Sequence, residues 1–143
     1  MAFCYYLSMT AVHNKVGDLG EDIACEFLQN KGFSVLETNF NRKWGELDLI
    51  TTKDRESIVF VEVKTKRCQI PDEVPREGED EYRLEENVSD EKRQRLKRTI
   101  QTYLDKNATG RPHWRVDLLC VYVDIRQKES RVNWLKNIII WKI

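Results

Sequence analysis

The chain has 143 residues, of which 41% are hydrophobic and 34% charged, and its 24 acidic side chains balance its 24 Lys and Arg side chains. A chain of this length can bury a hydrophobic core without disulfide bonds, so we expect one domain over residues 1–143. The four cysteines form no CxxC pair and lie beside no histidine cluster, which argues against a zinc site. The N-terminus lacks a basic segment, and no apolar run approaches the about 20 residues of a membrane span. We therefore expect a soluble, cytoplasmic protein with no membrane partner.

The first half of the chain predicts one helix followed by three strands. Apolar residues recur at helical spacing from about residue 14 to 31, and Gly32 ends the helix. Runs of apolar and β-branched residues then predict strands at 33–40, 45–52 and 57–66. The segment KDRE between the last two strands predicts a hairpin turn.

The second half predicts a loop, a helix and two strands. Residues 68–88 contain two prolines, one glycine and dense acid, which predicts a long, mobile, acidic loop. Ser89 or Asp90 caps the next helix, which ends within NATGRP at 107–112. The remaining apolar runs predict strands at 114–125, buried on both faces, and at 132–141.

This order of elements, αβββαββ, predicts an α/β fold. A helix that connects the third strand to the fourth favours a parallel pair, so we expect a mixed sheet of about five strands flanked by helices. The sequence contains no repeat and no Gly-rich phosphate loop, so no nucleotide cofactor is expected.

Charge is distributed unevenly along the chain. Residues 72–91 hold ten acidic and two basic side chains, a net charge of −8, so the remainder carries +8. The run KRQRLKR at 92–98 follows directly. Such a run is typical of a surface that binds a polyanion, although a solvated helix face has the same composition.

The strand IVFVEVKTK, residues 58–66, carries charge in an apolar setting. Alternate side chains of a strand share a face, so Glu62 and Lys64 lie on one side and three valines on the other. Burial of an unpaired charge costs several kcal/mol, so these groups must be solvated, paired or arranged around an ion.

Antiparallel pairing about a turn near Arg55 would place Asp48 opposite Glu62, and Glu46 opposite Lys64. A slip of one residue would turn the two acids to opposite faces of the sheet. In the first register, both carboxylates are close enough to hold a single cation.

Two hard oxygen donors suit Mg²⁺, for which Mn²⁺ can substitute, rather than zinc or copper. A metal held by Asp48 and Glu62 would activate water and polarise a phosphoryl oxygen, while Lys64 would position the nucleophile or stabilise the transition state. The alternative is a pair of exposed ion pairs, which contribute little to stability.

The chain also resembles a known family. GELDLI and VEVK resemble the D and (D/E)xK elements of the PD-(D/E)xK nuclease superfamily, with Leu47-Asp48 in place of Pro-Asp. GEDIACEFLQNKGFSVLETNFNRKWGELDLI, VFVEVKTK, VSDEKRQRLKRTIQTYL and RVDLLCVYVD resemble successive blocks of the YraN-like family of predicted endonucleases, which are distantly similar to Holliday junction resolvases. This resemblance implies a restriction-endonuclease-like core.

The resemblance also implies roles for single residues. Asp48 and Glu62 match the metal carboxylates and Lys64 the catalytic lysine. Glu21 matches an acid that reaches the same metal, although from the residues alone its neighbours Asp22 and Glu26 could equally serve. Glu46 matches the family's GE pair and is assigned a supporting role.

Asp117 also matches a family block, but an acid at the start of a buried strand is as compatible with a structural hydrogen bond. The four tryptophans could stack bases, and we expect packing in the core or at an interface instead.

We therefore expect a magnesium-dependent endonuclease whose partner is nucleic acid, with DNA favoured over RNA and branched DNA as one candidate substrate. Cutting two strands of a junction would favour a homodimer. The alternative is a non-catalytic nucleic-acid-binding module on a nuclease-like fold. The residues expected to bind phosphates are Arg42, Lys43, Lys66, Arg93, Arg95 and Lys97.

Overall fold

The computed structural model describes residues 5–6, 16–76, 89–107 and 113–138. Its elements, in chain order, are β1 (Tyr5–Tyr6), α1 (Val16–Asn30), β2 (Ser34–Arg42), β3 (Gly45–Thr52), β4 (Ser57–Arg67), α3 (Asp90–Asn107), β5 (His113–Asp124) and β6 (Glu129–Leu135). The order αβββαββ from α1 onward confirms the predicted α/β fold. The two-residue β1, which pairs with β6, was not predicted.

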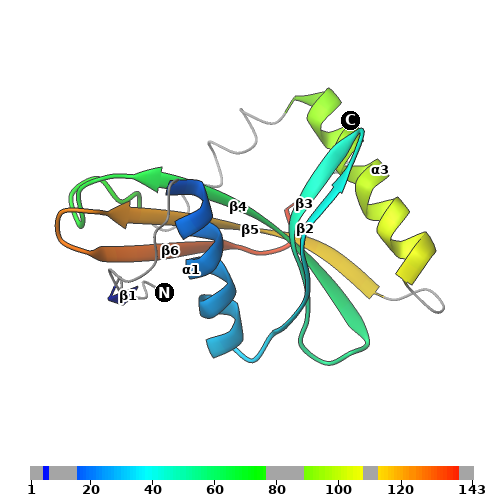
Figure 1. The fold of residues 1–143 in the computed structure, drawn as a ribbon, viewed down its shortest axis with the longest axis horizontal. Coiled ribbons are helices and arrows are strands. Elements are labelled where there is room, and N and C mark those ends of the chain that lie inside the picture. The colour runs from blue at the N-terminus through cyan, green and yellow to red at the C-terminus, as the bar shows by residue number, and fades with distance from the viewer. Residues whose placement is uncertain (1–4, 7–15, 77–88, 108–112, 139–143) are drawn as a thin grey trace.

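All strands form one mixed sheet in the order β1-β6-β5-β4-β3-β2. β4 and β5 run parallel along their length, from Ser57–His113 to Arg67–Val123, and the other neighbours are antiparallel. The connection between the parallel strands contains α3, as expected for a parallel pair. Figure 1 shows α1 across the middle of the sheet and α3 beside the β2–β3 hairpin.

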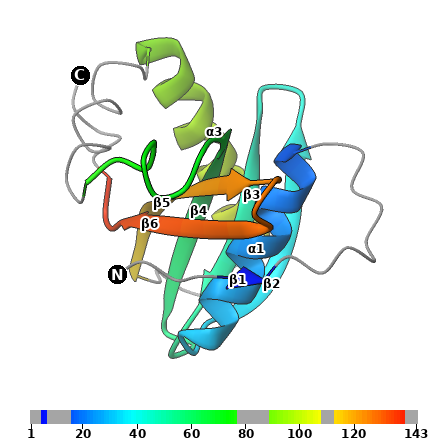
Figure 2. The ribbon, with the colours of Figure 1, turned by 90° about the vertical axis from the view of Figure 1, so that its left-hand side faces the viewer.

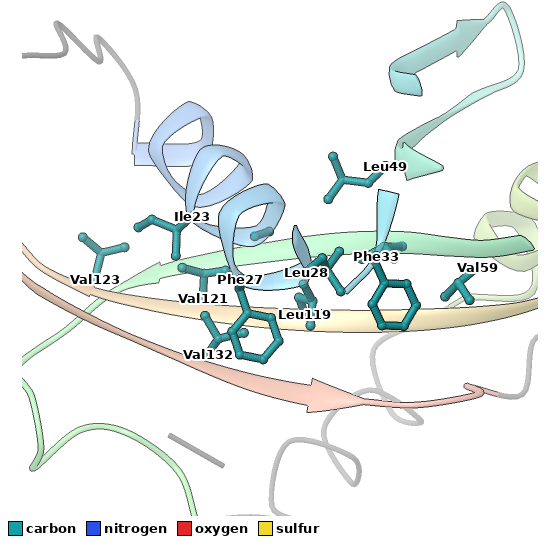
Figure 3. Packing of buried hydrophobic residues seen from close by; sticks show 12 residues of the cluster. Ile23, Phe27, Leu28, Phe33, Leu49, Val59, Leu119, Val121, Val123 and Val132 are labelled. Carbon is teal, nitrogen blue, oxygen red and sulfur yellow. The ribbon is translucent and has the colours of Figure 1, made fainter. Parts of the chain in front are cut away.

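The core lies on both faces of the sheet. Residues of α1 such as Ile23, Phe27 and Leu28 pack on Leu119 and Val121 of β5 (Figure 3). On the other face, Ile100 and Tyr103 of α3 pack with Phe40, Phe60 and Val116. The helices therefore lie on different sides of the sheet (Figure 2). The second face of β5 is covered mainly by the segment after β4, where Cys68 and Ile70 pack on Leu118, Cys120 and Tyr122, which accounts for the nearly continuous burial of β5.

The last strand and the predicted loop differ from expectation. β6 begins three residues before the predicted 132–141 strand and ends at Leu135, because a turn at 125–128 leads directly into pairing with β5. Residues 139–141 lie outside the described part of the chain.

The first part of the predicted 68–88 loop packs on the sheet. Cys68 and Ile70 are buried, and their amides donate to the Val123 carbonyl and the Asp124 carboxylate, each at 3.0 Å. Residues 77–88 lie outside the described residues. Neither of the two helices in the described residues is apolar enough along its length to cross a membrane.

Gly20 sets how closely α1 approaches β4. A Cβ atom at this position would overlap the Thr65 hydroxyl and lie 2.7 Å from the Thr65 Cβ. Any larger residue would therefore push α1 away from the strand.

We expect Gly20→Ala to lower the free energy of unfolding by about 1–3 kcal/mol, because its methyl group overpacks this contact. Gly17→Ala, in the same helix with open space around it, is the matched control and should be neutral or stabilising. Urea unfolding of both variants measures the difference. Equal stability of the two would contradict this role for Gly20.

Candidate metal centre between β3 and β4

The candidate site lies where β3 and β4 separate. Their ladder consists of the pairs Leu49–Val61, Ile50–Phe60 and Thr51–Val59, which confirms the predicted register. β3 nevertheless begins at Gly45, and β4 continues to Arg67 in its pairing with β5. The two strands therefore diverge beyond the Leu49–Val61 pair, as the departing β2–β3 hairpin in Figure 1 shows.

Asp48 occupies the first position beyond this ladder. Its side chain is only 9% exposed, and its Oδ2 accepts a hydrogen bond of 2.8 Å from the Val63 amide. Burial raises the pKa of Asp48, and the charge of Glu46 raises it further, whereas the Val63 amide and Lys92 oppose this shift. The carboxylate is thus held between the strands rather than in bulk solvent.

Glu62 faces the same opening from β4. Burial and then the charge of Asp48 raise the pKa of Glu62 to about 8. Its Oε1 atom is buried and has no hydrogen-bond partner. A buried acceptor without a partner is unfavourable, and a bound cation would supply the missing interaction.

Glu21 reaches the site from α1. It is half-buried, and burial followed by the charge of Asp48 raises its pKa, while a side-chain hydrogen bond with Asn39 lowers it. Asp22 and Glu26, which could equally serve on sequence alone, are exposed. The close approach at Gly20 brings Glu21 toward the opening between the strands.

Asn39 is a site residue that the sequence analysis missed. By extension of the Thr38–Leu49 and Phe40–Leu47 pairs, Asn39 lies opposite Asp48. It has a positive φ of 51°, which is uncommon for a residue with a side chain and is found most often with Asn. Its presence in a strand, where Asn is depleted, was the only signal available from the sequence.

Lys92 lies at the start of α3. The sequence indicated it only as part of the basic run 92–98 and gave it no role in the site. Its charge lowers the pKa of both Asp48 and Glu62. The preceding Ser89 caps the helix, because its Oγ accepts a hydrogen bond of 3.2 Å from the Lys92 amide. The N-terminus of α3 therefore places a cation near the two acids.

Lys64 and Glu46 are both exposed. Their expected pairing lies beyond the end of the β3–β4 ladder, where the strands have separated. Lys64 follows Glu62 by two residues on β4, so the two side chains leave the same face of the strand.

The predicted phosphate-binding residues do not form one cluster. Arg42, Lys43 and Arg95 line a common cleft at the tip of the β2–β3 hairpin. Lys66, Arg93 and Lys97 are outside this cleft, with Lys66 near the end of β4 and the other two on α3.

Asp117 has the structural role that was left open. It is fully buried and accepts two hydrogen bonds from the Arg115 guanidinium, at 3.0 and 3.1 Å. The Trp134 indole and the Asn137 amide also donate to it, at 2.9 and 2.8 Å. Trp134 itself packs on Phe27 and Phe33 in the core, as expected for the tryptophans.

The donor atoms of the site fit a hard divalent cation. No group of three Asp, Glu, His or Cys side chains among the described residues is arranged as a metal-binding cluster. Mg²⁺ is commonly held by one or two carboxylates with several waters, so Asp48 and Glu62 are sufficient for it. The partnerless Glu62 oxygen provides one such ligand atom.

Glu21, Asp48 and Glu62 lie in the part of the chain that is similar to other proteins. Residues 20–121 match the uncharacterised protein family UPF0102. A UPF0102 protein of Campylobacter lari is 37% identical over 108 residues, which cover 76% of this chain and 84% of that protein. Relatives from Alkaliphilus oremlandii and Syntrophomonas wolfei, also UPF0102 proteins, are 31% and 34% identical over 126 residues, 88% of this chain and 98% of each relative.

The raised pKa of Glu62 predicts how stability depends on pH when divalent cations are removed with EDTA. The folded protein retains a proton that the unfolded chain releases, so the free energy of unfolding should fall as the pH rises from about 4.5 to about 8. Glu62→Gln should flatten this decline, whereas Glu56→Gln, at an exposed position in the turn between β3 and β4, should not. Urea unfolding between pH 4.5 and 9 measures the slopes, and equal slopes for wild type and Glu62→Gln would refute the assignment.

Proposed function

The chain belongs to the uncharacterised protein family UPF0102, and from its site we propose that it is a magnesium-dependent endonuclease that hydrolyses phosphodiester bonds of DNA. The observation that carries the proposal is the buried pair of carboxylates between two diverging strands, with one Glu62 oxygen lacking a partner. Asp48 and Glu62, which form this pair, are also the two residues that the YraN-like resemblance implies as metal ligands.

Asp48 and Glu62 are the proposed ligands, with Glu21 as a further acid from α1 and the Val63 carbonyl as an additional candidate donor. When bound, Mg²⁺ or Mn²⁺ lowers the pKa of a coordinated water and polarises the phosphoryl oxygen. Lys64 is assigned to orient the attacking water or to stabilise charge on the phosphate, and Glu46 to support the site.

The electrostatics of the site favour a divalent cation. The pKa values of Glu21, Asp48 and Glu62 are all raised by burial first, and nearby carboxylates raise each of them further. Lys92 offsets part of this repulsion for Asp48 and Glu62. A cation with two charges would stabilise the ionised form of all three acids.

We expect Asp48→Asn, Glu62→Gln and Lys64→Ala each to lower cleavage by about 100-fold or more, because each removes a metal ligand or a group that stabilises the transition state. Glu56→Gln, in the exposed turn between β3 and β4, is the matched control and should cleave like wild type. The assay uses single-stranded, duplex, flap and four-way DNA with Mg²⁺. Wild-type cleavage by all three site variants would show that the activity comes from a contaminant or from another site.

Calorimetry separates this proposal from a nucleic-acid-binding module that lacks catalysis. We expect wild type to take up Mg²⁺ or Mn²⁺, and Asp48→Asn to abolish this uptake because the site loses one of its two main carboxylates. Absence of uptake by wild type, together with binding to structured DNA, would favour the module. The same binding assays with RNA test the choice of substrate.

A further inference from the structure

The tip of the β2–β3 hairpin and α3 enclose an open cleft of about 590 Å³. The hairpin lies close against α3 here, because a Cβ at Gly45 would lie 2.7 Å from the Thr99 hydroxyl and 3.4 Å from the Arg95 carbonyl. Its lining residues are Asn41, Arg42, Lys43, Trp44, Gly45, Glu46 and Arg95. We refer to it as the hairpin cleft.

The hairpin cleft is basic, since Arg42, Lys43 and Arg95 outweigh the single acid Glu46. The Arg42 guanidinium lies 4.0 Å from the centre of the Phe40 ring and donates to the Asn41 carbonyl at 2.6 Å. Contact with an aromatic face restricts the arginine and lowers the entropy cost of binding an anion.

Arg95 is available for a new partner. Its interaction with Glu91 spans 3.6 Å, and the two side chains are 61% and 86% exposed. An exposed ion pair of this kind contributes little to stability, so exchange of Glu91 for a phosphate costs little.

Trp44 lines the hairpin cleft and carries a hydrogen-bond donor whose partner is missing. Its indole Nε1 is buried and has no partner, while the Arg98 guanidinium lies 4.1 Å from the ring centre. A buried donor without an acceptor costs about 1–3 kcal/mol. A phosphate oxygen drawn into the cleft would supply that acceptor.

The position of the hairpin cleft relates it to the carboxylate site. Gly45 and Asp48 are three residues apart on β3, a distance of about 10 Å at about 3.3 Å per residue. This distance is short enough for one nucleic-acid strand to contact the hairpin cleft and the carboxylate site at the same time, because a strand advances about 3.4 Å along the duplex axis per nucleotide and successive phosphates are farther apart than this rise.

We propose that the hairpin cleft is a phosphate-binding subsite that holds the substrate strand beside the bond that is cut. This inference rests on the proposed nuclease function. Arg42, Lys43, Arg95 and the Trp44 indole would contact backbone phosphate, which positions the strand without reading its sequence. The ligand is a polynucleotide rather than a free phosphate, because the lining of the cleft reaches Glu46, two residues before Asp48 on β3, so one strand can contact both places.

The test measures binding without cleavage, by fluorescence anisotropy in EDTA with a labelled 20-nucleotide strand and the matching duplex. Arg42→Gln/Arg95→Gln should bind at least tenfold more weakly, and the slope of log affinity against log salt should become shallower by about 0.7–0.9 for each phosphate that the variant no longer binds. Arg55→Gln/Lys128→Gln removes the same charge from exposed residues at two other turns and should change affinity less than twofold. Equal affinity of the two double variants, or no DNA binding by wild type, would overturn the subsite.

Trp44→Phe separates binding from stability. This variant keeps an aromatic ring but removes the partnerless N–H, so we expect several-fold weaker DNA binding at unchanged thermal stability. Wild-type affinity would remove Trp44 from the subsite. Competition by inorganic phosphate or a mononucleotide as effective as that by the 20-nucleotide strand would overturn the assignment to a polynucleotide.

Failure of the subsite and failure of the nuclease proposal give different results. If Asp48→Asn abolishes cleavage while Arg42→Gln/Arg95→Gln binds DNA like its control, the nuclease stands and the subsite falls. If no metal-dependent cleavage is found but the cleft variants still bind DNA more weakly than their control, the subsite stands on a protein that binds DNA without cutting it.

Discussion

The hydrogen bond from the Val63 amide to the Asp48 carboxylate is the interaction on which the candidate site depends. Beyond the Leu49–Val61 pair, β3 no longer offers carbonyl groups to β4, and a buried amide there needs another acceptor. One oxygen of Asp48 supplies it, and the other takes no part in that bond. The residue that would bind a metal therefore also stabilises the separation of the strands that makes room for the metal.

Acid and base are segregated in this part of the molecule. Glu21, Asp48 and Glu62 gather where the strands diverge, while arginine and lysine line the neighbouring hairpin cleft. A phosphodiester is attracted by the basic groups and repelled by the acids unless a cation neutralises them. Binding of metal and binding of nucleic acid are therefore expected to favour each other, which is the arrangement that hydrolysis of a phosphodiester requires.

The sequence was sufficient to predict the element order, the β3–β4 register and the proximity of Asp48 to Glu62, because a short turn between two alternating strands determines the register and with it this proximity. It could not select Glu21 over its acidic neighbours, since that choice depends on how closely α1 packs at Gly20. Asn39 was missed for a related reason, because its positive φ and its contact with Glu21 arise only in the assembled sheet. The start of β6 was predicted too late because its first residues are polar and resemble a loop.

The short β3–β4 ladder leaves the two candidate carboxylates on segments that are held to different degrees. Glu62 belongs to a strand fixed to β5 from Ser57 to Arg67, whereas Asp48 belongs to a hairpin that meets β4 through three residue pairs. Segments with few backbone hydrogen bonds open at the lowest free energy. The gap between the carboxylates is thus held by three residue pairs and by the Asp48–Val63 hydrogen bond, so a change at either would alter its width without any change in the central sheet.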